Sequence, residues 1–145
     1  MAITTHGVQS PVGLAQLRIF TEEGVDPARV VVGHADSYHD MDFYLEVLAT
    51  GANLQFDFLG HRFGVEEALE PRLVETIVEL LERGFGPQLL LSQDVCHNRQ
   101  LKANGGFGYV YLLQHFLPTL RTAAVGEGEI RQMTIENPAR LLTVG

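Results

Sequence analysis

The sequence predicts an α/β fold in which short parallel strands alternate with helices. Four short apolar runs recur along the chain with a helical pattern between them. They are too apolar for half-buried strands, which is typical of parallel strands covered by helices. Each run ends at a residue that can bind a metal or move a proton, and these residues are His6, His34, Asp57 and Asp94. Functional side chains at the carboxyl ends of such strands are how a β/α barrel forms its active site.

The length of the chain limits how much of a barrel it can form. A closed eight-stranded barrel takes about 250 residues, whereas this chain has 145. Four βα units make half of a barrel, so we expect residues 1–145 to form a single partial barrel domain. The outer strands of such a half would have unpaired edges. A homo-oligomer that pairs these edges is therefore one expected assembly.

Apolar spacing, glycine and proline place the helices. Helices are predicted near 14–20, 44–48 and 71–81, and two or three terminal helices cover 109–120, 127–134 and 137–142. Gly24, Gly51 and Gly84 follow the first three, where glycine commonly ends a helix. Pro71, at a first-turn position, begins the helix with the clearest amphipathic pattern.

Composition argues against two classes of partner. The chain has 10 Lys and Arg against 18 Asp and Glu, a formal charge of −8, so it would repel a phosphate backbone and no nucleic acid is expected. No apolar stretch reaches the roughly 18 to 20 residues that cross a bilayer, so no membrane is expected either. The single cysteine, Cys96, cannot form an internal disulfide. That is typical of the reducing cytoplasm, where we expect the protein.

His6, His34 and Asp94 are the main candidate site residues. Two neutral imidazoles and a carboxylate are a common ligand set for zinc. Asp94 follows an apolar run, where an unpaired charge is costly and a cation would offset the cost. The alternatives are that Asp94 caps a turn and that each histidine is a structural residue.

Three further residues are weaker candidates. Asp57 could act in catalysis or pair with Arg62. Asp36 could orient His34, and the acidic stretch that contains it could cap the next helix. His97, on the loop after Asp94, could contact substrate. The glycine-rich turn at 105–108 does not follow a strand directly and lacks the full dinucleotide-binding spacing, so it does not predict a Rossmann site. It could present N–H groups to an anion, but a flexible turn into a helix is favoured.

Six stretches carry a family resemblance, at 4–6, 22–36, 56–60, 91–94, 105–109 and 136–142. With them the chain resembles the C-terminal half of the phosphotriesterase-like proteins of the amidohydrolase superfamily. The resemblance implies strands 5 to 8 of a TIM (β/α)8 barrel, with terminal helices. It also implies a hydrolase with two divalent metals, usually zinc, in a complete barrel.

The resemblance assigns roles to the candidate residues. His6 and His34 would bind the more exposed metal, and Asp94 would bind the buried metal and serve as the catalytic base. The family's His-x-His pair and its bridging Lys or Glu do not occur in these 145 residues. Phe58 stands where organophosphate-degrading members have a histidine.

We therefore expect a metal-dependent hydrolase that acts on a small-molecule ester, either a phosphoester or a lactone. Phe58 makes a lactonase or another carboxylic-ester hydrolase the narrower alternative. An alternative from another class is a catalytically inactive half-barrel that needs a partner. The 145-residue chain alone is expected to be inactive, because part of the metal site is missing from it.

Overall fold

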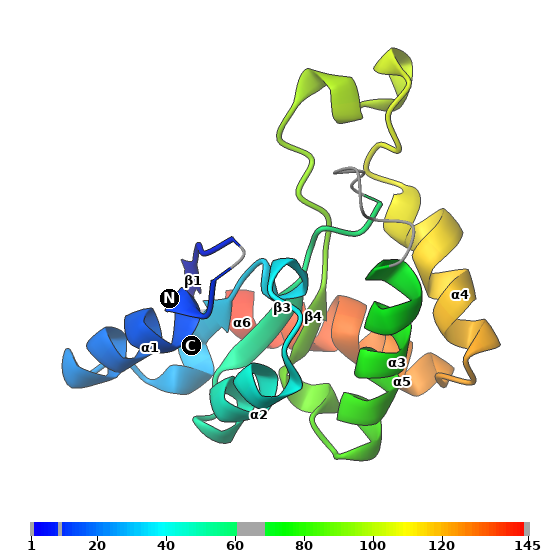
Figure 1. Ribbon diagram of the computed structural model, residues 1–145. Coiled ribbons are helices and arrows are strands. Elements are labelled where there is room, and N and C mark those ends of the chain that lie inside the picture. The colour runs from blue at the N-terminus through cyan, green and yellow to red at the C-terminus, as the bar shows by residue number, and fades with distance from the viewer. Residues whose placement is uncertain (1, 9, 61–68, 144–145) are drawn as a thin grey trace.

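The computed structural model describes residues 2–8, 10–60 and 69–143. Four strands form one parallel sheet, and neighbours in the sheet follow one another in the sequence (Figure 1). The strands are β1 (Ile3–Thr5), β2 (Val30–Val32), β3 (Asn53–Phe56) and β4 (Leu89–Leu91). The predicted alternation of parallel strands and helices is confirmed. The carboxyl ends of the four strands therefore lie along one edge of the sheet.

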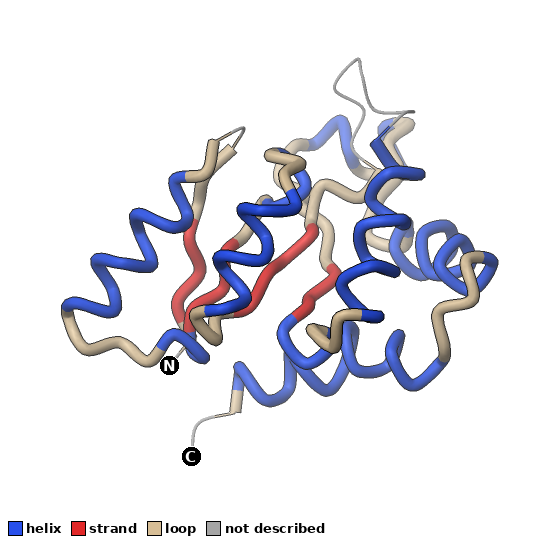
Figure 2. Tube along the Cα trace, turned by 60° about the horizontal axis from the view of Figure 1, so that its bottom comes forward, coloured by secondary structure: helices blue, strands red, loops and turns tan. Residues whose placement is uncertain are grey.

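Three helices connect the strands and cover one face of the sheet (Figure 2). They are α1 (Val12–Glu22), α2 (Met41–Ala49) and α3 (Leu69–Glu82). Leu17 of α1, Tyr44 of α2 and Ile77 of α3 belong to one buried apolar cluster with the strand residues that face them. Removing these side chains from water is the main force that holds the helices on the sheet.

The other face of the sheet is more polar. Strand side chains alternate between faces, so Val31 and Leu90 point to the face that the three helices do not cover. There they form a small cluster with Leu141. Asn53 and Gln55 alternate with Leu54 and Phe56, which belong to the helix-side core. This second face is the side that would point into a barrel.

The terminal segment differs from the prediction. Residues 112–122 form a helix made of η7 (Leu112–Phe116) and α4 (Leu117–Thr122). The predicted break between 134 and 137 is absent, because α5 (Glu127–Arg131), η8 (Gln132–Glu136) and α6 (Asn137–Leu142) follow one another without interruption. Proline clashes with the carbonyl four residues before it. A π-turn precedes Pro138, where the Asn137 N–H bonds to the Gln132 carbonyl, and the wider turn lets the helix continue.

Short 3-10 turns complete the connections. They are η1 (Pro27–Arg29), η2 (Ala35–Ser37), η4 (Gly86–Gln88), η5 (Asn98–Gln100) and η6 (Lys102–Asn104). Among the described residues, no helix is both long and apolar enough to span a membrane.

Candidate metal and catalytic site

The ends of β1, β2 and β3 bring three predicted residues into contact. The His34 Nε2 atom lies 2.9 Å from His6 Nδ1, and the His34 Nδ1 atom lies 2.7 Å from Asp57 Oδ1. The two rings meet edge to face, with centroids 4.6 Å apart. His6 is exposed, whereas the His34 side chain is 12% exposed and that of Asp57 is 5% exposed. The cluster thus runs from solvent at His6 to the protein interior at Asp57.

The backbone at the end of β2 is what places His34. This residue has a φ of 54°, in the left-handed region, which few residues other than glycine adopt. A Cβ on the preceding Gly33 would lie 3.0 Å from the Thr5 carbonyl oxygen, so glycine lets β1 and β2 approach closely there. The His34 N–H donates to Asp57 Oδ2 at 3.3 Å. Asp57 therefore holds both the ring and the backbone of His34.

Asp57 also determines which His34 nitrogen can bind a cation. A carboxylate that faces Nδ1 favours a proton on that nitrogen and leaves Nε2 with its lone pair. That lone pair is directed toward His6. Zinc lies about 2.0 to 2.1 Å from each imidazole nitrogen, so two nitrogens 2.9 Å apart need only a small separation to share one ion. The histidine pair fits a divalent metal.

Asp57 has a second side-chain partner that sequence reasoning missed. The Gln55 Nε2 atom donates to Asp57 Oδ2 at 2.6 Å. The available signal was a polar residue two positions before Asp57, on the face of the strand opposite Leu54 and Phe56. The predicted alternative partner, Arg62, lies outside the described residues.

The Asp36 carboxylate bonds to backbone N–H groups rather than to the His34 side chain. Its Oδ2 accepts from the Phe58 N–H at 2.7 Å and its Oδ1 from the Asp57 N–H at 3.3 Å. Burial, followed by the nearby charge of Asp57, raises the pKa of Asp36 to about 7. Within the acidic stretch Asp40 caps α2, since its carboxylate accepts from the Phe43 N–H. Asp36 instead fixes the backbone on either side of the Asp57 carbonyl.

Asp94 approaches the cluster through its backbone. Its N–H donates to the Asp57 carbonyl at 2.8 Å, and its Oδ2 lies 3.6 Å from the Cys96 thiol. Across residues 2–8, 10–60 and 69–143, no group of three or more His, Cys, Asp or Glu is placed to hold a metal ion. Binding of metal by Asp94 together with the histidine pair therefore stays a prediction.

The backbone of His97 bonds to Gln100 of the same loop. The His97 carbonyl accepts from the Gln100 N–H at 3.0 Å, and the His97 N–H donates to Gln100 Oε1 at 2.5 Å. Phe58, by contrast, stacks on His34 with ring centroids 4.8 Å apart and an angle of 21° between the planes. An apolar ring therefore covers one side of His34.

Comparison with known proteins identifies the family. The model of the phosphotriesterase family matches residues 1–142. This chain belongs to that family. The phosphotriesterase homology protein of Escherichia coli is 36% identical over 138 residues, which are 95% of this chain and 46% of the relative. Its crystal structure, described as complexed with phosphate in the active site, has a TM-score of 0.92 at 35% identity and covers 98% of this chain and 48% of that one.

Two further phosphotriesterase relatives show how varied the family is. A protein of Dictyostelium discoideum named N-acetyltaurine hydrolase is 31% identical over 153 residues, covering 99% of this chain and 41% of the relative. The organophosphorus hydrolase of Deinococcus radiodurans has a TM-score of 0.81 at 30% identity and covers 99% of this chain and 46% of that one. The chain thus spans a little under half the length of these relatives. Its four-stranded sheet is the C-terminal half of the family's TIM barrel.

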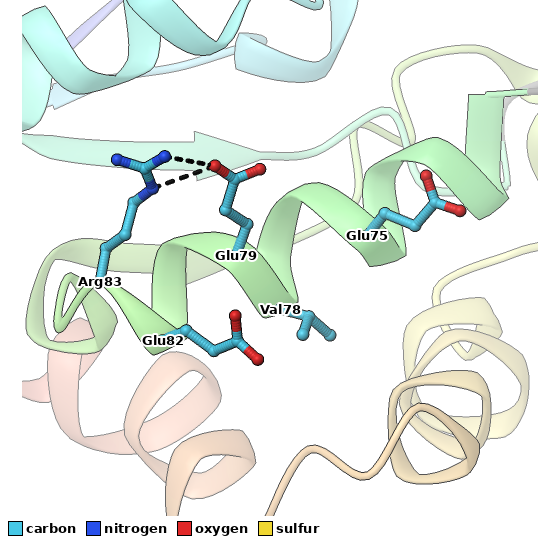
Figure 3. Close-up of a pocket in the computed structure, with 5 residues that line it drawn as sticks. All are labelled: Glu75, Val78, Glu79, Glu82 and Arg83. Carbon is cyan, nitrogen blue, oxygen red and sulfur yellow. Dashed lines mark hydrogen bonds and ion pairs between the residues drawn. The ribbon is translucent and has the colours of Figure 1, made fainter.

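A surface hollow lies apart from the candidate site. It lies along α3, and Figure 3 shows Arg83 paired with Glu79, which lies one turn earlier on the same helix. Its lining residues are Glu75, Val78, Glu79, Glu82 and Arg83. These residues lie in the second half of α3 or just after it, and this end of the helix leads to the start of β4. The hollow therefore lies away from the carboxyl edge of the sheet.

Proposed function

We propose that this chain supplies half of the active site of a metal-dependent hydrolase that cleaves ester-type bonds in small molecules. The observation that carries the proposal is the histidine pair, in which two imidazole nitrogens face each other at 2.9 Å and a buried carboxylate holds the second ring. A divalent metal, for which we propose zinc, would lower the pKa of water and polarise the bond under attack. A complete barrel would hold two such ions.

The candidate residues of this chain would have different roles in metal binding and proton transfer. His6 Nδ1 and His34 Nε2 would hold one ion, and Asp57 would keep His34 in the orientation and tautomer that binding requires. The Asp94 carboxylate would help to hold the second ion and would accept the proton of the attacking water. Phe58 would exclude water from one side of the His34 ring.

Phe58 also bears on the substrate. By the family resemblance it occupies the position where organophosphate-degrading members carry a histidine, and its ring, stacked on His34, cannot transfer a proton as a histidine would. We therefore place lactones and other carboxylic esters ahead of phosphotriesters. The relative named N-acetyltaurine hydrolase supports a second candidate, hydrolysis of an amide that carries an anionic group.

The test combines this chain with the portion of the Escherichia coli relative that it does not match, co-expressed to give what we call the complemented barrel. Lactones, carboxylic esters, aryl phosphotriesters and N-acetyltaurine would be assayed with zinc and after chelation. We expect turnover of lactones that a chelator abolishes and added zinc restores. Turnover of none of the four would support the inactive half-barrel, and turnover that survives chelation would contradict metal dependence.

A further inference from the structure

The loop after β4 is organised around one buried side chain, that of Gln100, which is 7% exposed. The Gln100 Oε1 atom accepts from the N–H of Cys96 at 2.9 Å and from that of His97 at 2.5 Å. Its Nε2 atom donates to the Asp94 carbonyl at 3.2 Å. Two donors on one side and an acceptor on the other allow only this orientation of the amide.

These contacts complete the backbone bonding of Asp94. The Asp94 N–H is held by the Asp57 carbonyl, and its carbonyl is held by Gln100. Asp57 is the residue that also holds the ring of His34. A connected set of hydrogen bonds therefore leads from Gln100 through Asp94 and Asp57 to the metal-facing histidine.

The returning part of the loop holds Gln100 in place. The Gly108 N–H donates to the Gln100 carbonyl at 2.8 Å, and a Cβ on Gly106 would lie 2.2 Å from the carbonyl carbon of Gln100. Only glycine can pack that closely. Gln93 then ties this segment to the following helix, because it donates to the Gly108 carbonyl and accepts from the Leu112 N–H, both at 3.1 Å. The glycine-rich turn, expected to be flexible, packs against Gln100.

We propose that Gln100 is a positioning residue that sets the orientation of Asp94 for proton transfer. The inference rests on the proposed function for the role of Asp94, and on the observed contacts for the rest. Gln100 acts through the backbone, so its loss would tilt the Asp94 carboxylate without removing it. A misplacement of about 1 Å far from the reacting atoms can cost about 10²-fold in rate.

Two variants separate this role from general support of the loop. Gln100→Ala removes the three side-chain bonds described above. Gln100→Glu keeps acceptors for the Cys96 and His97 N–H groups and removes only the donor to Asp94. Asn104→Ala is the matched control, because Asn104 lies on the same loop and bonds only to Asn98 among the side-chain contacts described for it.

The first measurement is residue-resolved hydrogen exchange of the full chain, which needs no activity. For Gln100→Ala we expect the Cys96 and His97 amides, which lose their acceptor, to exchange about threefold to tenfold faster, as the loss of one hydrogen bond implies. The Asp94 N–H keeps its bond to the Asp57 carbonyl, so its exchange should rise in both variants only because the residue is held less firmly through its carbonyl. For Gln100→Glu we expect the Cys96 and His97 amides to exchange as in the unmodified chain. An Asp94 amide that exchanges in both variants as it does in Asn104→Ala would overturn the proposal.

The second measurement is kinetic and uses the complemented barrel. Both Gln100 variants should lower kcat by about 10- to 100-fold while KM changes far less. A kcat equal to that of Asn104→Ala would overturn the positioning role even if exchange were faster. If the unmodified complemented barrel turns over no substrate, the proposed function fails, while the exchange data still decide whether Gln100 orients Asp94.

Discussion

At the scale of single residues, the site depends on how Asp57 is held. The side chain of Asp57 is 5% exposed, and its carboxylate has three partners, which are the ring of His34, the backbone N–H of His34 and the amide of Gln55. A buried charge is tolerated only when it is paired and hydrogen-bonded. These bonds stabilise the carboxylate in the position from which it orients His34.

Replacing Asp57 should weaken metal binding without removing a metal ligand. Asp57→Asn keeps an oxygen that can face His34 Nδ1 but loses the charge that favours a proton there. We expect the Kd for zinc to rise by about 10- to 100-fold, the usual effect of losing such a partner. Isothermal titration of the chain with zinc measures this, with Asp42→Asn on the exposed side of α2 as the control. Equal affinities in the two variants would contradict the role.

Replacing Asp94 should affect turnover far more than substrate binding. In the complemented barrel, Asp94→Asn removes a group that would accept a proton in the transition state, and losing a general base typically costs about 10² to 10⁴ in rate. Most substrate contacts would remain. Steady-state kinetics should show a lower kcat with a similar KM, whereas a raised KM with unchanged kcat would show that Asp94 contributes binding alone.

At the scale of elements, the C-terminal helix joins the strand starts. The Asn137 Nδ2 atom donates to the carbonyls of Gly86 and Leu89, both at 2.8 Å. Arg140 donates to Asn53 Oδ1 at 2.9 Å and to the Pro87 carbonyl at 2.8 Å. All these acceptors lie at the starts of β3 and β4 or just before them. The helix therefore braces the end of the sheet opposite the histidine pair.

Asn137→Ala should destabilise the fold without changing the site. Asn137 is 3% exposed, so its loss leaves two carbonyls without their side-chain donor, and a buried group left unsatisfied costs about 1 to 3 kcal/mol. Urea unfolding should show a lower midpoint, while zinc affinity of the folded chain stays the same. A urea midpoint equal to that of the Asn104→Ala control would show that the side-chain bonds of Asn137 add no stability.

His39 connects the start of α2 to α3 and gives stability a pH dependence. Its Nε2 lies 3.3 Å from Thr76 Oγ1, and burial, followed by the charge of Arg72, lowers its pKa below the ordinary 6.5, although Asp40 opposes the shift. The unfolded chain therefore takes up this proton first. As pH falls from 6.5 toward the folded pKa, this residue makes the fold less stable.

The measurement is the free energy of unfolding as a function of pH. His39→Gln keeps a polar group near Thr76 and removes the titration, so the decline in stability below pH 6.5 should become shallower than in the unmodified chain. An unchanged slope would show that other groups set the pH dependence.

At the scale of the whole molecule, the two outer strands of the described sheet each have one unpaired edge. Among the described strands, β1 pairs only with β2 and β4 only with β3. An unpaired edge is a template for another strand. On the face that would point into a barrel, Val31 and Leu90 are already buried in a cluster with Leu141. We therefore expect association to occur through the strand edges.

We propose that the 145-residue chain alone forms homo-oligomers through these edges and is inactive. A second copy could pair strands but would duplicate His6, His34 and Asp94 without adding the family's other ligands. Light scattering coupled to size exclusion should show a mass above that of one chain, which is 16.0 kDa, and assays with zinc should show no turnover. A stable monomer with multiple turnovers would contradict both expectations.

The sequence by itself determined the order of strands and helices and the edge of the sheet at which the candidate site residues lie. Uniformly apolar runs are buried in any arrangement, and the strand ends of a parallel sheet must meet at one edge. The contact of His6 with His34 also needs β1 and β2 to be neighbours in the sheet, which the structure supplies. Local chemistry was sufficient to predict the strands and helices, because each of them depends on residues close together in the chain.

Only the tertiary structure decided which side chains hydrogen-bond to one another. Asp57 could have paired with any nearby cation, and its contact with His34 required the φ of 54° after Gly33. Gln55 is marked in the sequence only as a polar residue two positions before Asp57, and nothing in the sequence marks Gln100. A glutamine holds other groups in place only when burial removes water and leaves it specific partners. The uninterrupted helix through Pro138 likewise depends on a π-turn, which apolar spacing does not encode. Hydrogen-bond geometry between distant segments is fixed by packing, and packing is a property of the whole fold.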